Sequence, residues 1–247
     1  MIKKSAKLTT AIAIVLSVQG CARLGESWSY SGKSGPDYWG ELTPSFSTCK
    51  TGSNQSPIDI TRAIEGNLPA LKIAYKVGGE KVINNGHTIG VNYEKGSTIT
   101  VGDRTFELKQ FHFHAPSENT IEGKPFPMEA HFVHADKRGN LAVVAVMYNE
   151  GMFNAELEKV WAQMPEQANT KVTLKQPVNA DKLIPANHDY YRFNGSLTTP
   201  PCSEGVNWFV VKAYDTASKE QIAKFSRAIG HDNNRPVQPV NGRVIVK

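Results

Sequence analysis

The feature that most constrains the fold is a series of short segments in which apolar and polar residues alternate. They are residues 72–77, 97–101, 105–114, 128–135, 141–148 and 207–214, separated by turn-forming residues. Alternation with a period of two is typical of β-strands, and many of these segments have no helix between them. The sequence therefore predicts an α+β, mainly β fold, built on a large, twisted, mostly antiparallel central sheet.

Two segments predict short helices at the periphery of this sheet. Residues 154–164 carry an apolar stripe and stop before Pro165. Residues 218–229 begin at Ser218 with a capping box and end before Gly230. Their apolar faces are of the kind that packs against a core. Residues 28–57 are rich in Gly, Ser and Pro, and predict an irregular arm on the surface.

The first residues have the plan of a secretory signal peptide. A lysine-containing start precedes an apolar run at 11–18, too short for a membrane anchor in the mature chain. We expect 1–21 to be the signal peptide and 22–247 to form one domain without a transmembrane segment. Cys21 ends a Val-Gln-Gly-Cys run similar to a bacterial lipoprotein box. Lipidation at Cys21 and plain cleavage nearby are both open, so the protein is expected in the periplasm, tethered to the outer membrane, or secreted.

The net charge of the chain gives little support for nucleic-acid binding. Residues 1–21 contain three Lys and no acid, so the formal charge of +5 leaves 25 basic against 23 acidic residues in the remainder. No basic stripe appears, and an ordinary mixed surface is expected. Two cysteines, Cys49 and Cys202, lie deep in the chain. In an oxidising compartment they would be expected to pair, the alternative being two free buried thiols.

A histidine pair on a predicted strand provides the first chemical signal. On a strand, Gln110, His112 and His114 share one face, while Phe111 and Phe113 point to the other. Two imidazoles spaced two residues apart on a strand can converge on one metal ion. This alternating pair flanked by phenylalanines is harder to assign to ordinary packing than a single histidine.

The next strand offers the third ligand. His131 and His134 have opposite parity, so only one of them can face the metal. Glu129 shares a face with His131 and can accept its free ring N–H, as Gln110 can for His112. We therefore choose His131, and expect His134 to form a structural hydrogen bond on the opposite face.

Three neutral imidazoles leave the fourth tetrahedral position of Zn²⁺ for water. That is the pattern of a catalytic zinc site, because structural zinc sites are closed by four protein ligands and are usually rich in Cys. The sequence contains no HExxH, no CxxC and no GxxxxGK motif. If Cys49 and Cys202 form a bridge, no thiolate remains to close the site.

Five motifs together resemble the α-class carbonic anhydrases, in their bacterial, exported branch. The matching segments, in the order of the family and spread over residues 28–246, are Gln55-Ser56-Pro57-Ile58-Asp59-Ile60, Asn85-Gly86-His87, Phe111-His112-Phe113-His114, Glu129-Ala130-His131-Phe132-Val133-His134 and Gly195-Ser196-Leu197-Thr198-Thr199-Pro200-Pro201-Cys202. The resemblance implies a single α-carbonic anhydrase catalytic domain and Zn²⁺ as cofactor. It also implies a Cys49–Cys202 disulfide and leaves a homodimer as one option.

The resemblance also implies the reaction and the residues that carry it. Zinc held by His112, His114 and His131 acidifies a water molecule, and the hydroxide attacks carbon dioxide to give bicarbonate. Thr198 would orient the hydroxide while donating its own proton to Glu118.

The remaining implied roles concern the substrate and the proton. Thr199 would line the substrate side of the pocket, and the apolar wall would be formed by Val133, Val143, Leu197 and Trp208. His87 corresponds to the family's proton shuttle, the alternative being an ordinary surface histidine in a turn. We assign His188 and His231 to the surface.

Three hypotheses from different classes follow. The first is a zinc lyase that interconverts carbon dioxide and bicarbonate. The second is a binding module without catalysis, such as the relatives that have lost zinc ligands. The third is a zinc hydrolase acting on esters. The full set of three histidines with Thr198 and Glu118 favours the first, and the sequence shows no polar subsite for a larger substrate.

Overall fold

The computed structural model describes residues 27–247, so the predictions for the signal peptide and for Cys21 lie outside the described residues. The strands are β1 (Asp59–Ile60), β2 (Leu71–Ala74), β3 (Gly79–Asn84), β4 (Ile89–Tyr93), β5 (Thr98–Val101), β6 (Arg104–His114), β7 (Thr120–Ile121), β8 (Met128–Ala135), β9 (Leu141–Glu150), β10 (Thr170–Val178), β11 (Tyr190–Ser196), β12 (Glu204–Val211) and β13 (Asp215–Ala217). The helices are α1 (Trp39–Leu42), α2 (Thr48–Thr51), α3 (Ala155–Trp161) and α4 (Lys219–Ile229), with 3₁₀ turns η1 (Gly32–Ser34), η2 (Pro44–Phe46) and η3 (Ala180–Leu183).

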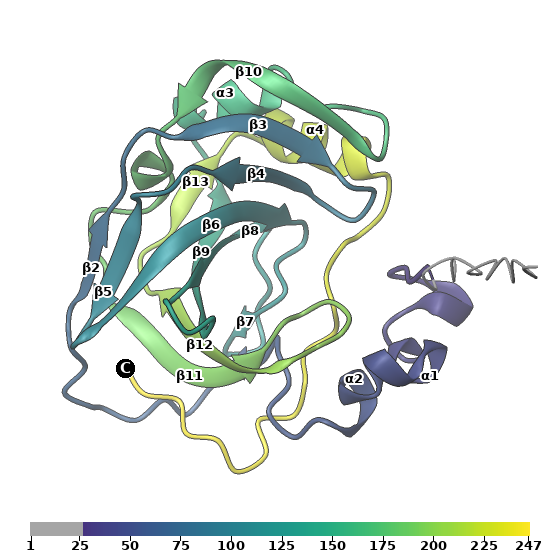
Figure 1. Ribbon diagram of the computed structural model, residues 1–247, viewed down its shortest axis with the longest axis vertical. Helices are drawn as coiled ribbons and strands as arrows, with labels where there is room; N and C mark the ends of the chain where they lie inside the picture. Colours follow the sequence, from purple (N-terminus) through teal and green to yellow (C-terminus); the bar gives the residue numbers. More distant parts are fainter. Residues whose placement is uncertain (1–26) are drawn as a thin grey trace, which may run out of the picture.

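An 11-stranded curled sheet forms the body of the molecule (Figure 1). Its main path runs β10-β3-β4-β6-β8-β9-β12-β11, with β2, β5 and β13 attached at the sides. Neighbours along the path are antiparallel except for β9 and β12, and β13 also joins β9 in parallel. The predicted fold class, a large mostly antiparallel sheet with short peripheral helices, is confirmed.

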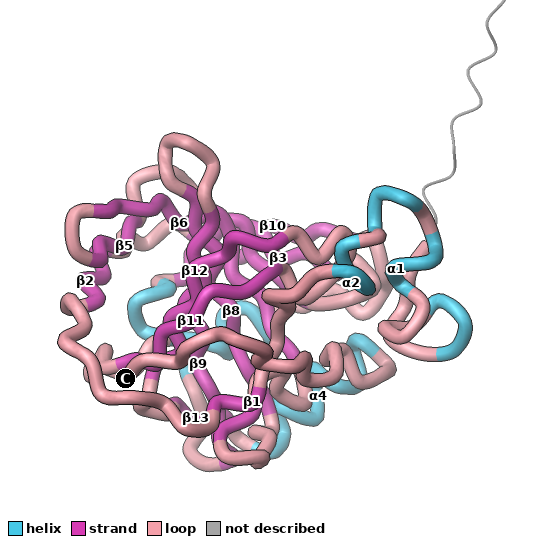
Figure 2. Tube along the Cα trace, turned by 90° about the horizontal axis from the view of Figure 1, so that it is seen from below, coloured by secondary structure: helices cyan, strands magenta, loops and turns pink. Residues whose placement is uncertain are grey.

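Each predicted strand overlaps an observed one, with differences at the ends. The segment predicted at 72–77 leaves the sheet after Ala74, because the Tyr75 hydroxyl turns to His134 and the Lys76 N–H bonds to the Ser97 hydroxyl. The arm predicted as irregular contains the short turns η1, α1, η2 and α2, each of three or four residues. These turns lie together at one end of the molecule in both views (Figures 1 and 2).

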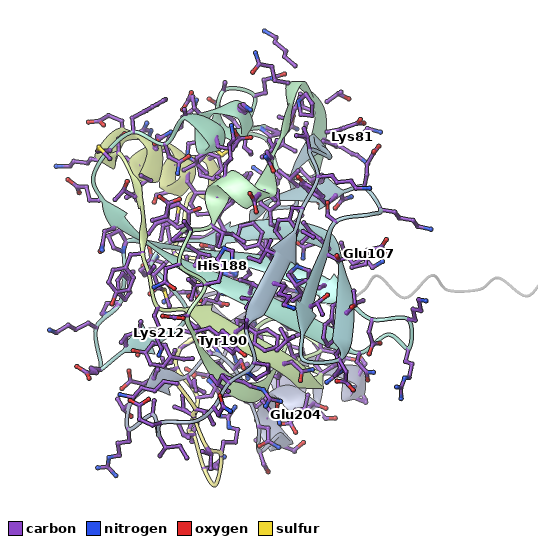
Figure 3. All side chains as sticks on the ribbon, turned by 90° about the vertical axis from the view of Figure 1, so that its left-hand side faces the viewer. Lys81, Glu107, His188, Tyr190, Glu204 and Lys212 are labelled. Carbon is purple, nitrogen blue, oxygen red and sulfur yellow. A yellow bond between two sulfur atoms is a disulfide. The ribbon has the colours of Figure 1, made fainter. Side chains whose placement is uncertain are left out.

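The two faces of the sheet bury different side chains. Phe111 and Phe113 of β6 lie fully buried on the face that the helices α3 and α4 cover. The ring of Phe113 contacts Trp161 of α3, with centroids 4.8 Å apart. Lys81 of β3 is exposed to solvent (Figure 3). The opposite face is therefore free to carry the imidazoles that β6 and β8 place there.

Both helices begin as their sequences predict, and α4 also ends where predicted, whereas α3 ends at Trp161, before the predicted end at Met164. The Asn154 side chain accepts hydrogen bonds from the first backbone N–H groups of α3, and Ser218 forms a full capping box with Gln221 on α4. Helix α4 ends at Gly230, whose φ of 77° is left-handed and suits glycine. No helix in residues 27–247 has the length and apolarity needed to span a membrane.

A disulfide joins Cys49 of α2 to Cys202, so the pairing predicted for these cysteines is confirmed. Their Cα atoms are 5.0 Å apart. The two residues pack with Trp39 in a small cluster of their own. The bridge ties the N-terminal arm to the loop that follows β11, which carries Thr198 and Thr199.

His134 is a buried histidine on the helix-covered face of the sheet. Its Nδ1 lies 3.2 Å from the Ala142 carbonyl oxygen, and its Nε2 lies 2.6 Å from the Tyr75 hydroxyl. A carbonyl only accepts, so Nδ1–H donates to it and Nε2 accepts the Tyr75 proton. Burial lowers the pKa of His134 to about 3. The ring is therefore neutral and structural, as its parity on the strand predicted.

This arrangement predicts acid sensitivity. In the unfolded chain His134 has its ordinary pKa of 6.5, whereas in the folded protein its pKa is about 3. The stability that the neutral ring contributes is thus present above pH 6.5 and is lost as the pH falls. Between pH 7 and 4.5, we expect the free energy of unfolding to drop by about 2–3 kcal/mol more in the wild type than in His134→Gln. Urea unfolding followed by tryptophan fluorescence measures both, and equal drops would contradict the prediction.

Candidate active site

Strand register places the histidines of β6 and β8 side by side. His112 is paired with His131 across the two strands, and His114 is paired with Glu129. On the outer side of β6, His112 faces Gly90 of β4, which leaves room beside the imidazole. Side chains at paired positions point to the same face of a sheet. The three imidazoles therefore share one face, opposite to Phe111 and Phe113.

One ring nitrogen of each imidazole is held by a hydrogen bond. His112 Nδ1 is 2.8 Å from the Gln110 Oε1, and His131 Nε2 is 2.8 Å from the Glu129 Oε1. His114 Nδ1 is 2.7 Å from the backbone carbonyl oxygen of Asn233. These three oxygens accept, so the bonded nitrogen carries the proton in each ring. The other nitrogen of each ring is left with a lone pair.

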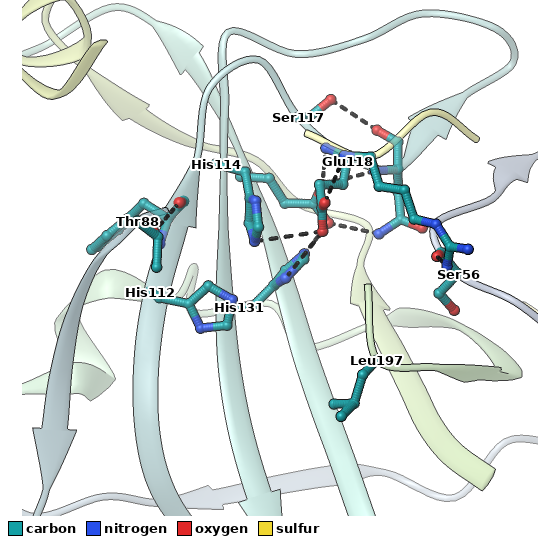
Figure 4. Close-up of polar contacts among 12 residues, drawn as sticks. Ser56, Thr88, His112, His114, Ser117, Glu118, His131 and Leu197 are labelled. Atoms are coloured by element: carbon teal, nitrogen blue, oxygen red, sulfur yellow. Dashed lines mark hydrogen bonds and ion pairs between the residues drawn. The ribbon is translucent and has the colours of Figure 1, made fainter. Parts of the chain in front are cut away.

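The free nitrogens converge on one point, as Figure 4 shows. One ligand atom from each of His112, His114 and His131 lies within 4.8 Å of the others. His114 Nε2 is buried and has no hydrogen-bond partner among the described residues. A buried lone pair without a partner is costly unless something electrophilic occupies the space. Three neutral nitrogens around such a point are the donor set of a divalent metal such as zinc.

The electrostatics of the three rings keep them unprotonated. Desolvation is the largest cause that lowers the pKa of His112 well below its usual value. Repulsion from the charge that His114 and His131 would carry when protonated is the second. The same two causes act on His131, and burial also lowers the pKa of His114. Metal binding requires neutral imidazole. The site is thus prepared to accept a cation at neutral pH without first losing protons.

Glu118 lies next to the convergence point. Its Oε1 accepts the Arg235 backbone N–H at 2.9 Å, while its Oε2 is 3.5 Å from His114 Nε2 and has no hydrogen-bond partner within the described chain. Burial raises the pKa of Glu118 to about 8, although Arg235 and the Thr198 side chain act to lower it. A divalent cation nearby would lower this pKa and so favour the ionised carboxylate.

Glu129 anchors the loop that carries Glu118. Its Oε2 accepts the backbone N–H groups of Glu118 and Asn119 at 2.8 and 2.9 Å, and its Oε1 accepts from the Asn119 side chain and from His131. Burial raises the pKa of Glu129, and the hydrogen bonds from Asn119 oppose this. One carboxylate therefore orients a metal-facing imidazole and positions the loop of Glu118.

The predicted apolar residues gather beside the histidines. Val133, Val143 and Trp208 are paired across β8, β9 and β12, and Leu197 packs on the same cluster. The ring of Trp208 contacts His131, with centroids 5.0 Å apart. The wall is therefore continuous with the histidine site.

A cavity of about 290 Å³ opens from the histidine site toward solvent. Its lining includes Thr199, Gln110, His112 and His114, together with His87, Trp28 and Tyr30. The His87 ring stacks on Trp28 at 3.7 Å between centroids. The four apolar wall residues are not among its lining, and the wall instead meets the histidine site where Trp208 contacts His131.

Comparison of the sequence with models of known protein families identifies the family of this chain. The family model described as eukaryotic-type carbonic anhydrase matches residues 34–247. The chain belongs to the carbonic anhydrase family.

Relatives and solved structures agree with this assignment. A carbonic anhydrase of Neisseria gonorrhoeae is 50% identical over 244 residues, covering 98% of this chain and 96% of the relative. One from Pectobacterium carotovorum is 48% identical, covering 96% and 98%. The α-carbonic anhydrase of Thermovibrio ammonificans, solved with the inhibitor sulfanilamide, superposes with a TM-score of 0.89 at 51% identity, covering 90% of this chain and 100% of that one. The predicted family and enzyme class are confirmed.

Two residues of this carbonic anhydrase site escaped prediction from sequence. Asn233 supplies the carbonyl oxygen that holds His114, and its amide also donates to the carbonyl oxygens of His87 and Phe113. Arg235 supplies the backbone N–H that holds Glu118. The only available signal was indirect: with Gln110 and Glu129 assigned, His114 still lacked an acceptor for its ring N–H. Every residue has a backbone carbonyl, so the sequence does not indicate which one accepts this hydrogen bond.

Proposed function

We propose that the protein catalyses the reversible, zinc-dependent hydration of carbon dioxide to bicarbonate and a proton. The observation that carries the proposal is the convergence of three imidazole nitrogens whose other ring nitrogens are all hydrogen-bonded. When bound, zinc would act as a Lewis acid that brings the pKa of a coordinated water near 7, the value known for carbonic anhydrase itself, and so provides hydroxide at neutral pH.

The chain's own residues would orient the attack. Thr198 lies beside Glu118, and its hydroxyl can donate a hydrogen bond to that carboxylate. The Thr198 oxygen would then accept a hydrogen bond from the attacking oxygen. Accepting that proton requires Glu118 to be ionised. Glu118 is held from behind by the Arg235 N–H, so its second oxygen stays directed at the site. This arrangement would fix the direction of the oxygen lone pair.

The apolar wall would hold the substrate. Carbon dioxide is nonpolar and carries no charge, so a surface formed by Val143 and Trp208, both nearly fully buried, suits it better than polar anchors. Thr199 lines the polar side, where the charged product forms. We assign the wall to carbon dioxide and the Thr199 side to bicarbonate.

A chelation experiment tests the proposal. Stopped-flow hydration of carbon dioxide is measured on the purified mature chain before chelation, after removal of bound metal, and after readdition of zinc. We expect turnover to disappear with the metal and to return with zinc in a one-to-one ratio. Activity indifferent to chelation would reject the zinc mechanism. Turnover of esters but not of carbon dioxide would favour the hydrolase hypothesis.

His87 is proposed to move the product proton to buffer. Burial, followed by the charge of His231, lowers the pKa of His87, so its ring stays neutral and able to accept a proton until the pH falls below its usual 6.5. In dilute buffer we expect His87→Ala to lower hydration turnover by roughly 10-fold or more, because proton removal becomes limiting. Added imidazole should restore the rate, and concentrated buffer should hide the defect. A variant with the same buffer dependence as the wild type would remove the assignment.

We also propose that the chain is an exported protein with one catalytic domain, a periplasmic location being our first choice. The basic start and the apolar run at 11–18 support this, and Cys21 supports lipid attachment as one route to retention. The mass of the mature N-terminal peptide distinguishes a lipidated Cys21 from plain cleavage. An uncleaved chain would contradict export through a signal peptide.

A further inference from the structure

A second histidine lies beside His87 at the mouth of the cavity. His87 belongs to the turn between β3 and β4, and His231 follows the end of α4. Both rings lie against Tyr30, with centroid distances of 6.3 and 5.7 Å. His231 Nε2 is also 3.4 Å from the carbonyl oxygen of Gly86, the residue before His87. Two segments far apart in the sequence thus bring two titratable rings to one place.

The surroundings of His87 fix its position at the cavity. Its ring stacks on Trp28 with an angle of 11° between the planes. Its backbone N–H donates to Asn85 Oδ1, and its carbonyl oxygen accepts from the Asn233 amide. The ring is half-buried, and Trp28 covers one of its faces. The stacking covers a face of the ring and not its edge, where the two nitrogens exchange protons.

Both ring nitrogens of His231 lie near carbonyl oxygens. Its Nδ1 is 2.9 Å from the Asp232 carbonyl oxygen, and its Nε2 faces the Gly86 carbonyl oxygen. Carbonyl oxygens only accept hydrogen bonds, and neutral imidazole has a single N–H. The neutral ring therefore donates to one of them and keeps a lone pair on the other nitrogen, and a proton taken up there can be donated to the second carbonyl oxygen. The side chain is exposed, so it can exchange protons with buffer directly.

The other titratable groups around the pair do not compete for the proton. Burial raises the pKa of the Tyr30 hydroxyl well above its ordinary value, so this group stays neutral. Asp232 is exposed and adjoins His231 in the chain. The three metal-site imidazoles are not among the ring contacts of His87 within residues 27–247.

We propose that His87 and His231 form a two-histidine relay that delivers the product proton to buffer. The proposal rests on the proposed hydration of carbon dioxide. A proton that His87 has accepted leaves its ring nitrogen through solvent while His231 takes one up at its lone-pair nitrogen. His231 then releases a proton to buffer, and both rings return to the neutral form. Repulsion between the two charges means that the pair carries one proton at a time.

Two substitutions separate a relay from a mere neighbouring charge. His231→Gln removes both the charge and the proton exchange, whereas His231→Lys keeps a positive charge that does not exchange near neutral pH. On the zinc-loaded mature protein, the titration midpoint of His87 is followed by NMR of its imidazole carbon-bound proton. We expect the midpoint to rise by roughly 0.3 pH units in His231→Gln and not to rise in His231→Lys. Hydration turnover in dilute buffer should fall by roughly 3-fold in both variants and be normal in concentrated buffer.

His188→Gln is the matched control. This histidine lies in a separate surface groove with Tyr190 and Lys212 (Figure 3), and neither measurement should change. Wild-type turnover of His231→Gln in dilute buffer would overturn the relay even if the midpoint moved. Equal losses in dilute and concentrated buffer would overturn it as well, since they indicate a disturbed cavity. If the wild type failed to hydrate carbon dioxide at all, the proposed function would fail, while the NMR midpoints would still report the coupling.

Discussion

His131→Ala should abolish both metal binding and hydration of carbon dioxide. The substitution removes one of the three convergent nitrogens. It also removes the hydrogen bond that the fully buried Glu129 accepts from His131. Two remaining imidazoles cannot hold zinc in an open tetrahedral site. We expect zinc content near zero after dialysis, and turnover lower by at least roughly 1,000-fold, because hydroxide is no longer available at neutral pH.

Metal analysis and stopped-flow hydration on the same sample measure this result. His188→Ala is the control for loss of a histidine as such, and it should keep one zinc per chain and normal turnover. Circular dichroism establishes that the His131→Ala chain is folded. A folded variant that retains zinc and activity would show that residue 131 is not a ligand.

Thr198→Ala should lower turnover by roughly 100-fold while zinc remains bound. The hydroxyl of Thr198 contacts no histidine nitrogen in our proposal, so its loss should spare the metal. It should misdirect the attacking oxygen, because the contact toward Glu118 disappears. Misplacement of a reacting group by about 1 Å can cost a factor of this size.

The conservative variant Thr198→Ser provides the matched comparison. Serine keeps the hydroxyl and loses only a methyl group, so most of the turnover should return. Zinc content, measured in parallel, should equal one per chain in both variants. Full turnover in Thr198→Ala would refute the orienting role, and loss of zinc would show that Thr198 supports the metal site instead.

Much of the site could be predicted because its chemistry follows strand parity. The alternation in β6 placed Gln110, His112 and His114 on one face, and the structure shows two phenylalanines packed on the other. Opposite parity also distinguished His131 from His134 on β8. The observed hydrogen bonds of Gln110 and Glu129 follow the same logic, because each lies two residues from the imidazole it holds.

The remainder depends on contacts that have no local signature. Asn233 reaches His114 through a backbone carbonyl, which any residue could supply. The Arg235 guanidinium donates hydrogen bonds to the Gln55 side chain and to the carbonyl oxygens of Ser56 and Cys49, which connects the N-terminal arm to the site. These partners are separated from it by 179 to 186 positions. No pattern within a window of ten or twenty residues reports such a pairing.

The segment that follows α4 has a consequence for the order in which the protein becomes functional. It supplies the carbonyl oxygen for one metal-facing imidazole and the N–H for Glu118, and its residues follow all the strands of the described chain in sequence. A growing chain that has already formed its sheet would hold three histidines with one ring still unrestrained. We infer that the metal site is complete only once this C-terminal segment has docked against β6 and Glu118.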